Sequence, residues 1–177
     1  MRYGLLPVTR RVWSLRGTRP VCPVNPRYEW AYLYGAAEVG GEARVEFLYT
    51  STVDLEFSGL FLQQVGAREP GATHVVLWDG AGFHPQDGAA GLPENVRLLP
   101  LPSYSPELNP IEGLWDQLTD HLCNKVFASL RALEEAITEF LQPFWENPER
   151  IRDLIGQGWL LARAQAFFRQ LSTSMAV

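Results

Sequence analysis

A short apolar run that ends at an acidic, glycine-rich segment limits the possible folds of this chain more than any other feature. Residues 74–78 (HVVLW) are followed at once by Asp79 and the residues Gly-Ala-Gly. A run of this length bounded by turn residues is typical of a strand that is buried on both faces and stops at the edge of a sheet. Such a strand needs covering layers on either side, which predicts an α/β domain.

The segments before this run predict two strands and a helix. Alternating and apolar residues over 28–39 and 43–50 predict a hairpin that turns at Gly40-Gly41. Asp54 is placed to cap a helix that extends to about Val65. Its inward-facing residues are predicted to be Leu55, Phe57, Leu60, Phe61 and Leu62.

The segments after the run predict a further strand and three helices. Residues 96–101 are predicted to form a strand that ends near Pro100, and prolines 100, 102, 106 and 110 make a stiff connector. One helix begins at Asn109 and presents one apolar face. That face comprises Ile111, Leu114, Trp115, Leu118 and Leu122. The other helices are expected from Ser129, as cap, to about Trp145, and over 148–171 with an interruption near Gly156 and Gly158.

Composition narrows the class of protein. The 177 residues, 46% of them hydrophobic, suffice for one domain with a core. No apolar run reaches the ~18–20 residues of a membrane span and no signal peptide is evident, which predicts a soluble cytoplasmic protein. Cys22 and Cys123 suggest no disulfide framework, and the three histidines have no zinc-ligand spacing. The sequence contains no glycine loop of the nucleotide-binding kind, so no small-molecule cofactor is predicted.

Charge is divided unevenly along the chain. Residues 1–30 hold six arginines and one acid, a net +5, whereas the rest of the chain carries -10. Residues 1–27 lack a clean period and are predicted to form an extended basic arm. Arginine suits bidentate phosphate contacts, although a solvated loop or a general arginine bias would give the same pattern. The DNA-contact hypothesis names Arg10, Arg11, Arg16 and Arg19.

Two carboxylates stand where chemistry is expected. Asp79 follows the buried strand, and Glu112 lies in the first turn of the helix that begins near Asn109. Carboxylates on rigid elements can bind Mg²⁺, and paired ions can drive phosphodiester cleavage. Asp79 could instead cap a turn, and Glu112 could complete a capping box with Asn109. His84 could be a solvated loop histidine, and Asp116 either a second ligand or a surface acid.

Four stretches carry a resemblance to a known family. Residues 77–84 (LWDGAGFH) and 98–118 (LLPLPSYSPELNPIEGLWDQL) resemble the second and third catalytic blocks of DDE-type transposases. Together with residues 10–21 and 28–36, they are similar to the bacterial insertion-sequence branch of the mariner superfamily. The resemblance implies a ribonuclease H-like mixed sheet flanked by helices, and a site that binds two Mg²⁺ or Mn²⁺ ions through three acids. It also implies DNA as partner, with strand cleavage and strand transfer (DNA transposition, integration and recombination) as the activity.

The resemblance assigns roles to individual residues. Asp79 and Glu112 match the second and third catalytic, metal-binding acids; His84, Asn109 and Pro110 match supporting positions; Asp116 matches none. The implied organisation is a basic arm (1–27), a partial ribonuclease H-like DDE catalytic domain (28–128) and a helical C-terminal extension (129–177).

The match departs from the family at its start. The family's first acid lies on the first central strand just before the position of Met1, so that strand and acid are expected to be missing. We therefore expect a transposase fragment that is inactive alone, whether a decayed gene, a frameshift product or a mis-started reading frame. The alternatives are a non-catalytic remnant that binds DNA or forms a homodimer, and a metal-dependent hydrolase of small phosphate esters.

Overall fold

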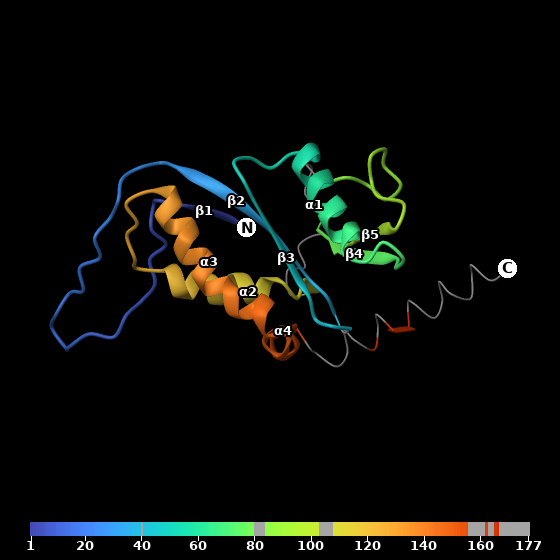
Figure 1. The fold of residues 1–177 in the computed structure, drawn as a ribbon. Coiled ribbons are helices and arrows are strands. Elements are labelled where there is room, and N and C mark those ends of the chain that lie inside the picture. The colour runs from blue at the N-terminus through green and yellow to red at the C-terminus, as the bar shows by residue number, and fades with distance from the viewer. Residues whose placement is uncertain (40, 80–83, 103–107, 156–161, 163–164, 167–177) are drawn as a thin grey trace.

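The computed structural model describes residues 1–39, 41–79, 84–102, 108–155, 162 and 165–166 (Figure 1). The described part is mixed α/β, as the sequence predicts. Its strands are β1 (Arg2–Gly4), β2 (Trp30–Ala37), β3 (Val45–Thr50), β4 (His74–Trp78) and β5 (Val96–Pro100). Its helices are α1 (Leu55–Ala67), α2 (Glu112–Leu122), α3 (Leu130–Glu146) and α4 (Pro148–Ile155).

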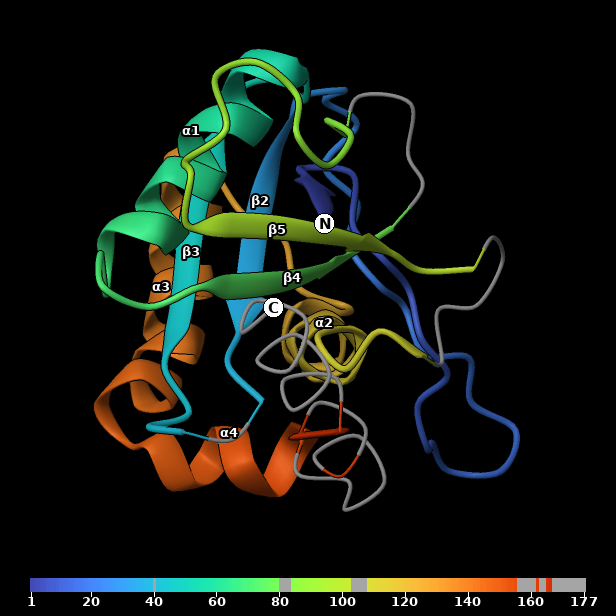
Figure 2. The same cartoon turned by 90° about the vertical axis from the view of Figure 1, so that its right-hand side faces the viewer.

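The strands form two separate sheets. β1, β2 and β3 make an antiparallel sheet in that order, in which Tyr3 pairs with Ala31 and Leu33 pairs with Tyr49. β4 and β5 form a parallel pair in which Trp78 lies opposite Pro100. In Figure 2 this pair runs across β2 and β3. The segment from β3 to β4 contains α1, so the chain crosses from one sheet to the other through a helix.

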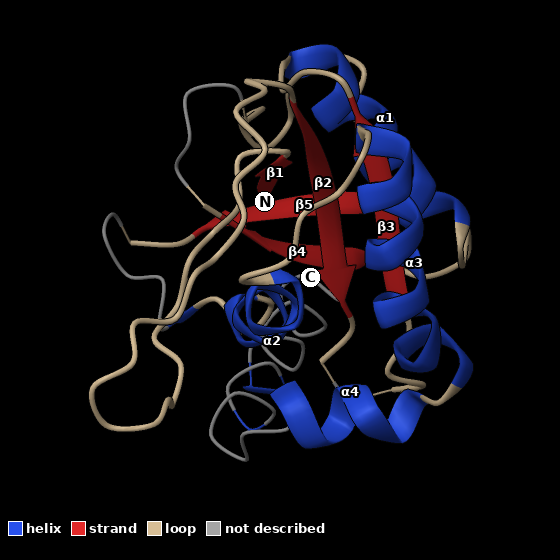
Figure 3. Cartoon of the chain, turned by 90° about the vertical axis from the view of Figure 1, so that its left-hand side faces the viewer, coloured by secondary structure: helices blue, strands red, loops and turns tan. Residues whose placement is uncertain are grey.

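Two apolar cores lie on opposite faces of the β2–β3 hairpin. Ala31, Leu33 and Val45 face α2, α3 and α4, which cover one side of the three-stranded sheet (Figures 1 and 3). Tyr34 and Leu48 point the other way and pack with α1, β4 and β5. Because successive side chains of a strand alternate between faces, a hairpin that is covered on both sides must be apolar on both.

Individual residues account for the starts of two helices, for one turn and for one close contact between elements. Asp54 accepts a hydrogen bond from the Phe57 N–H at 2.9 Å, and Ser129 accepts one from Ala132 at 3.2 Å, which confirms both predicted N-caps. Gly41 adopts φ +52° in the turn of the hairpin. Gly35 lies under the Trp115 ring, where a Cβ would approach Cη2 to 2.5 Å, so only glycine allows this packing.

Three details differ from the sequence-based expectations. Residues 2–4, predicted to be arm, form β1, because their backbone pairs with the open edge of β2. Leu55 and Leu60 are 61% and 46% exposed, since only the opposite face of α1 meets the core. The third difference is at Asn109, which precedes α2 instead of starting it.

Some predicted features lie outside the described residues. These are Gly40, Pro106 and the predicted interruption near Gly156 and Gly158, with most of the chain after 155. Within the described residues, no helix combines the length and apolar character needed to cross a membrane.

The orientation of α1 can be tested with two leucines two residues apart. Leu62 is fully buried and Leu60 is 46% exposed. We expect Leu62→Ala to lower the free energy of unfolding by about 2–5 kcal/mol, because it leaves a cavity. The matched control, Leu60→Ala, should stay within about 0.5 kcal/mol of the parent in urea unfolding. Equal decreases for the two variants would contradict the observed packing.

Candidate active site

A cleft of about 1460 Å³ lies between the two cores. β4 supplies Asp79 just beyond its last residue, and α2 supplies Glu112 in its first turn. His84, Asn109 and Pro110 also line this cleft. The structure thus brings together the five site residues that the sequence predicted outside the arm, and Asp116 lines the same cleft.

His84 binds Asp79 in two ways. Its Nδ1 lies 2.7 Å from Asp79 Oδ1 and 2.9 Å from the Asp79 carbonyl oxygen. Both of these atoms can only accept a hydrogen bond, so Nδ1 carries the hydrogen. The imidazole is 12% exposed, against 57% for the Asp79 side chain. His84 is therefore a packed partner of Asp79 and not a solvated loop residue.

Asn109 contacts the carboxylate of Glu112. Its side-chain Nδ2 donates to Glu112 Oε1 at 3.5 Å, and the Glu112 N–H donates to the Asn109 backbone carbonyl at 3.1 Å. A capping box would instead need the Asn109 side chain to accept from the helix N–H groups, and α2 has no side-chain cap. This geometry favours an orienting contact on Glu112 over the capping alternative.

The electrostatics show that the two carboxylates share one environment. Burial raises the pKa of Glu112, and the charges of Asp116 and Asp79 raise it further, while the Met1 α-ammonium opposes them. Burial lowers the pKa of that ammonium, and Glu112 and Asp79 both act to raise it. Asp79 and Glu112 therefore interact across the cleft, from different elements and different cores.

The donor chemistry suits a hard divalent cation. Asp79 and Glu112 offer carboxylate oxygens from a strand end and a helix start, which are ligands that Mg²⁺ and Mn²⁺ accept. No group of three or more acidic, histidine or cysteine side chains in the described part of the chain is arranged to hold a metal ion. The described residues thus bring two carboxylates to the cleft and no complete ligand set.

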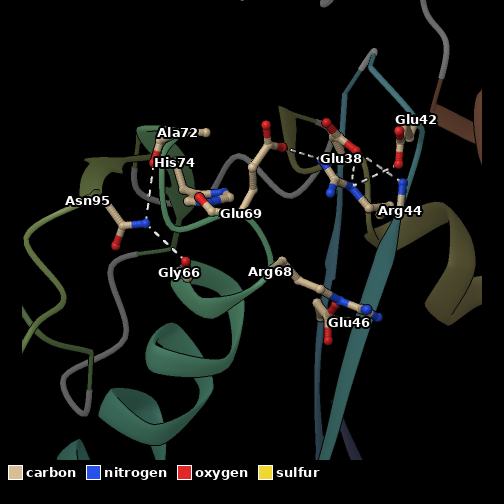
Figure 4. Close-up of polar contacts among 10 residues, drawn as sticks. All are labelled: Glu38, Glu42, Arg44, Glu46, Gly66, Arg68, Glu69, Ala72, His74 and Asn95. Atoms are coloured by element: carbon tan, nitrogen blue, oxygen red, sulfur yellow. Dashed lines mark hydrogen bonds and ion pairs between the residues drawn. The ribbon is translucent and has the colours of Figure 1, made fainter.

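Ion pairs also join residues of the hairpin to residues at the end of α1, and these residues line the cleft (Figure 4). Arg44 of the hairpin binds Glu38 at 3.2 Å and reaches Glu69, beyond α1, at 2.8 Å. Arg68, which caps the end of α1, pairs with Glu46 of β3. The Arg44 guanidinium lowers the pKa of Glu69. Sequence patterning gave no sign of this network, because its links from the hairpin to Arg68 and Glu69 join residues that lie 22 and 25 positions apart in the chain.

The four arm arginines lie apart from Asp79 and Glu112. The arm projects from the body on the side away from β4 and β5 (Figure 1). Arg10 is tied to the body by an ion pair with Asp120 at 2.9 Å. Arg11, Arg16 and Arg19 are exposed and make no ion pair within the described residues.

A family model and a sequence relative identify the chain. Residues 2–134 match the model described as DDE superfamily endonuclease. The chain is also 34% identical over 102 residues to the uncharacterized protein y4pE/y4sA of Sinorhizobium fredii, which covers 55% of this chain and 73% of that protein. With three quarters of its length matched, this protein belongs to the DDE superfamily endonuclease family.

Solved structures of Mos1 transposase share the fold. The Mos1 strand transfer complex matches 92% of this chain with a TM-score of 0.61 and 18% identity. The mariner paired-end complex with Mn matches 86% with a TM-score of 0.55 and 15% identity. These matches confirm the ribonuclease H-like fold class that the sequence predicted. The chain spans about half the length of these Mos1 chains.

The raised pKa of Glu112 makes a prediction about stability. The folded chain holds the Glu112 proton more tightly than the unfolded chain, so this residue favours folding most below its ordinary pKa of 4.5. That contribution declines as the pH rises through the raised value. We expect Glu112→Gln to lessen the decrease in unfolding free energy between acidic and neutral pH, measured with urea in metal-free buffer. Glu94→Gln, at an exposed glutamate, should follow the parent curve, and identical curves for all three proteins would contradict the assignment.

Proposed function

We propose that this chain is the catalytic part of a transposase of the mariner superfamily, from the bacterial insertion-sequence branch. The observation that carries the proposal is the meeting of Asp79 and Glu112 in one cleft of a chain that belongs to the DDE endonuclease family. The reaction is DNA strand cleavage followed by strand transfer. The DNA-bound Mos1 complexes of the same fold support DNA as the substrate. Such a protein acts in the bacterial cytoplasm.

Each site residue has a part in the proposed chemistry. Asp79 and Glu112 would hold Mg²⁺ or Mn²⁺, two ions in the complete site, and the ions would supply charge stabilisation and an activated oxygen nucleophile. His84 orients Asp79 through its Nδ1–H, and Asn109 orients Glu112 through its side-chain amide. Pro110 fixes the backbone between Asn109 and the helix, because its ring restricts φ.

The isolated chain is proposed to be inactive. The described residues supply two acidic ligands, and we propose that DNA cutting needs a third. The edge of β2 beyond Leu33 and the outer edge of β4 are both unpaired among the described strands. Unpaired strand edges need a partner, which supports a working form that includes more than these residues, either a longer chain or a homodimer.

Metal binding tests the two acids without requiring activity. We expect Asp79→Asn and Glu112→Gln each to weaken Mn²⁺ binding at least about tenfold, since removal of even an outer-shell partner costs about 10–100-fold. Titration followed by electron paramagnetic resonance measures this, with Glu94→Gln as the control. Equal affinity in all four proteins would argue against the site.

Cleavage of transposon-end DNA tests the activity itself. We expect the purified chain to leave transposon-end DNA uncut in Mg²⁺. Cutting that both Asp79→Asn and Glu112→Gln abolish would overturn the proposed inactivity and support the enzyme. Hydrolysis of a phosphomonoester without any action on DNA would instead indicate the small phosphate-ester hydrolase.

The salt dependence of DNA binding tests the arm. We propose that Arg10, Arg11, Arg16 and Arg19 contact backbone phosphates. Replacing all four with alanine should weaken binding to every sequence and flatten the salt slope by about 0.9 for each phosphate that is no longer neutralised. A triple variant that replaces Arg11, Arg16 and Arg19 but keeps Arg10 should bind DNA nearly as weakly as the quadruple variant, because Arg10 already pairs with Asp120. Arg131→Ala, on α3, is the control, and an unchanged slope in the quadruple variant would leave the arm as ordinary surface.

A further inference from the structure

Trp78, the last residue of β4, combines deep burial with an unpaired polar atom. Its side chain is 9% exposed, although the next residue carries a carboxylate that is 57% exposed. Among the described residues, Trp78 Nε1 is the buried side-chain nitrogen without a hydrogen-bond partner. An unpaired buried donor is unfavourable. A tryptophan at this position is therefore explained by what its ring contacts and not by its N–H.

The Trp78 ring lies between the core and His84. Its centroid is 4.5 Å from that of His84, with 60° between the ring planes. On the core side it meets Phe61 of α1 at 6.3 Å and 33°. The Trp78 ring thus contributes to the burial of an imidazole that belongs to no helix or strand. Phe61, itself 1% exposed, anchors the tryptophan.

Two contacts with described residues constrain the orientation of the imidazole. The Trp78 ring packs against it, and Nδ1 donates to the carboxylate and the carbonyl of Asp79. The Asp79 side chain is mostly exposed, so packing alone does not select its rotamer. The hydrogen bond from the packed His84 ring holds one carboxylate oxygen of Asp79. The chain of contacts therefore runs from the α1 core through Trp78 and His84 to the carboxylate.

We propose that Trp78 is a positioning residue for Asp79. Its ring holds the His84 imidazole in one orientation, and the His84 Nδ1–H holds one oxygen of the Asp79 carboxylate. A carboxylate set in advance gives up less side-chain freedom when it binds a cation. This inference rests on the proposed function in so far as Asp79 binds a metal ion. The link from Trp78 to His84 can be measured without one.

The tautomer of His84 is the first measurement, made by NMR of ¹⁵N-labelled imidazoles in the metal-free full chain. At a pH where the ring is neutral, the parent should show a single tautomer with the hydrogen on Nδ1. Trp78→Met, which keeps the bulk and removes the ring, should give a mixture of tautomers. Trp78→Phe, which keeps a ring, should behave as the parent. Trp115→Leu, at an equally buried tryptophan of the other core, should be less stable but retain the tautomer.

A double-mutant cycle on Mn²⁺ affinity is the second measurement. Trp78→Met and His84→Ala should each raise the Mn²⁺ dissociation constant about tenfold, the lower end for removal of an outer-shell partner. The double variant should bind no more weakly than His84→Ala alone, because Trp78 acts through His84. Additive effects, an unchanged His84 tautomer in Trp78→Met, or a mixture of tautomers in Trp78→Phe would each overturn the proposal.

The two measurements separate this inference from the proposed function. If the parent chain binds no Mn²⁺ but Trp78→Met still gives a mixture of His84 tautomers, the proposed metal site is wrong and the proposed role of the Trp78 contact is supported. If Asp79→Asn abolishes Mn²⁺ binding but Trp78→Met leaves the tautomer intact, the metal site stands and this inference fails. Trp78→Leu replaces Trp78→Met in both measurements if the methionine variant does not fold.

Discussion

The packing of two apolar cores against opposite faces of one hairpin governs this structure. β2 and β3 turn Leu33 and Val45 toward one core and Tyr34 and Leu48 toward the other. Asp79 is attached to the second core through β4, and Glu112 to the first through α2. Asp79 and Glu112 therefore lie in one cleft because both cores pack on the same hairpin, which fixes the position of one core relative to the other. Close packing of this kind transmits position from one layer to the next.

The described residues provide contacts around the two carboxylates but not a complete set of metal ligands between them. Each acid has a polar partner from its own segment, His84 for Asp79 and Asn109 for Glu112. The far end of the cleft is spanned by the Arg44 network, whose half-exposed ion pairs contribute little stability individually. Their effect is geometric, since they connect the hairpin to the end of α1. Each carboxylate is thus contacted from its own segment, while the described residues hold no group of three or more potential metal ligands.

Charge is separated in space as well as in sequence. The basic arm leaves the body on the side away from β4 and β5 (Figure 1), whereas the acids lie in the cleft that β4 borders. Separation prevents the arginines from neutralising the carboxylates within the chain. Arg10 is the exception, because its ion pair with Asp120 holds the start of the arm against α2.

Local sequence was enough to predict the order of the elements from β2 onward and both helix caps, and it named Asp79 and Glu112 as the candidate acids. Those features depend on residues near one another in the chain: the alternation of β3, the oxygens of Asp54 and Ser129, and the acid that follows HVVLW. Packing in three dimensions settled which face of α1 is buried, that the Asn109 side chain contacts the Glu112 carboxylate instead of capping α2, and that Trp78 packs on His84. Each of these depends on the direction of a side chain relative to another element, and that direction is set by packing between layers and not by local sequence.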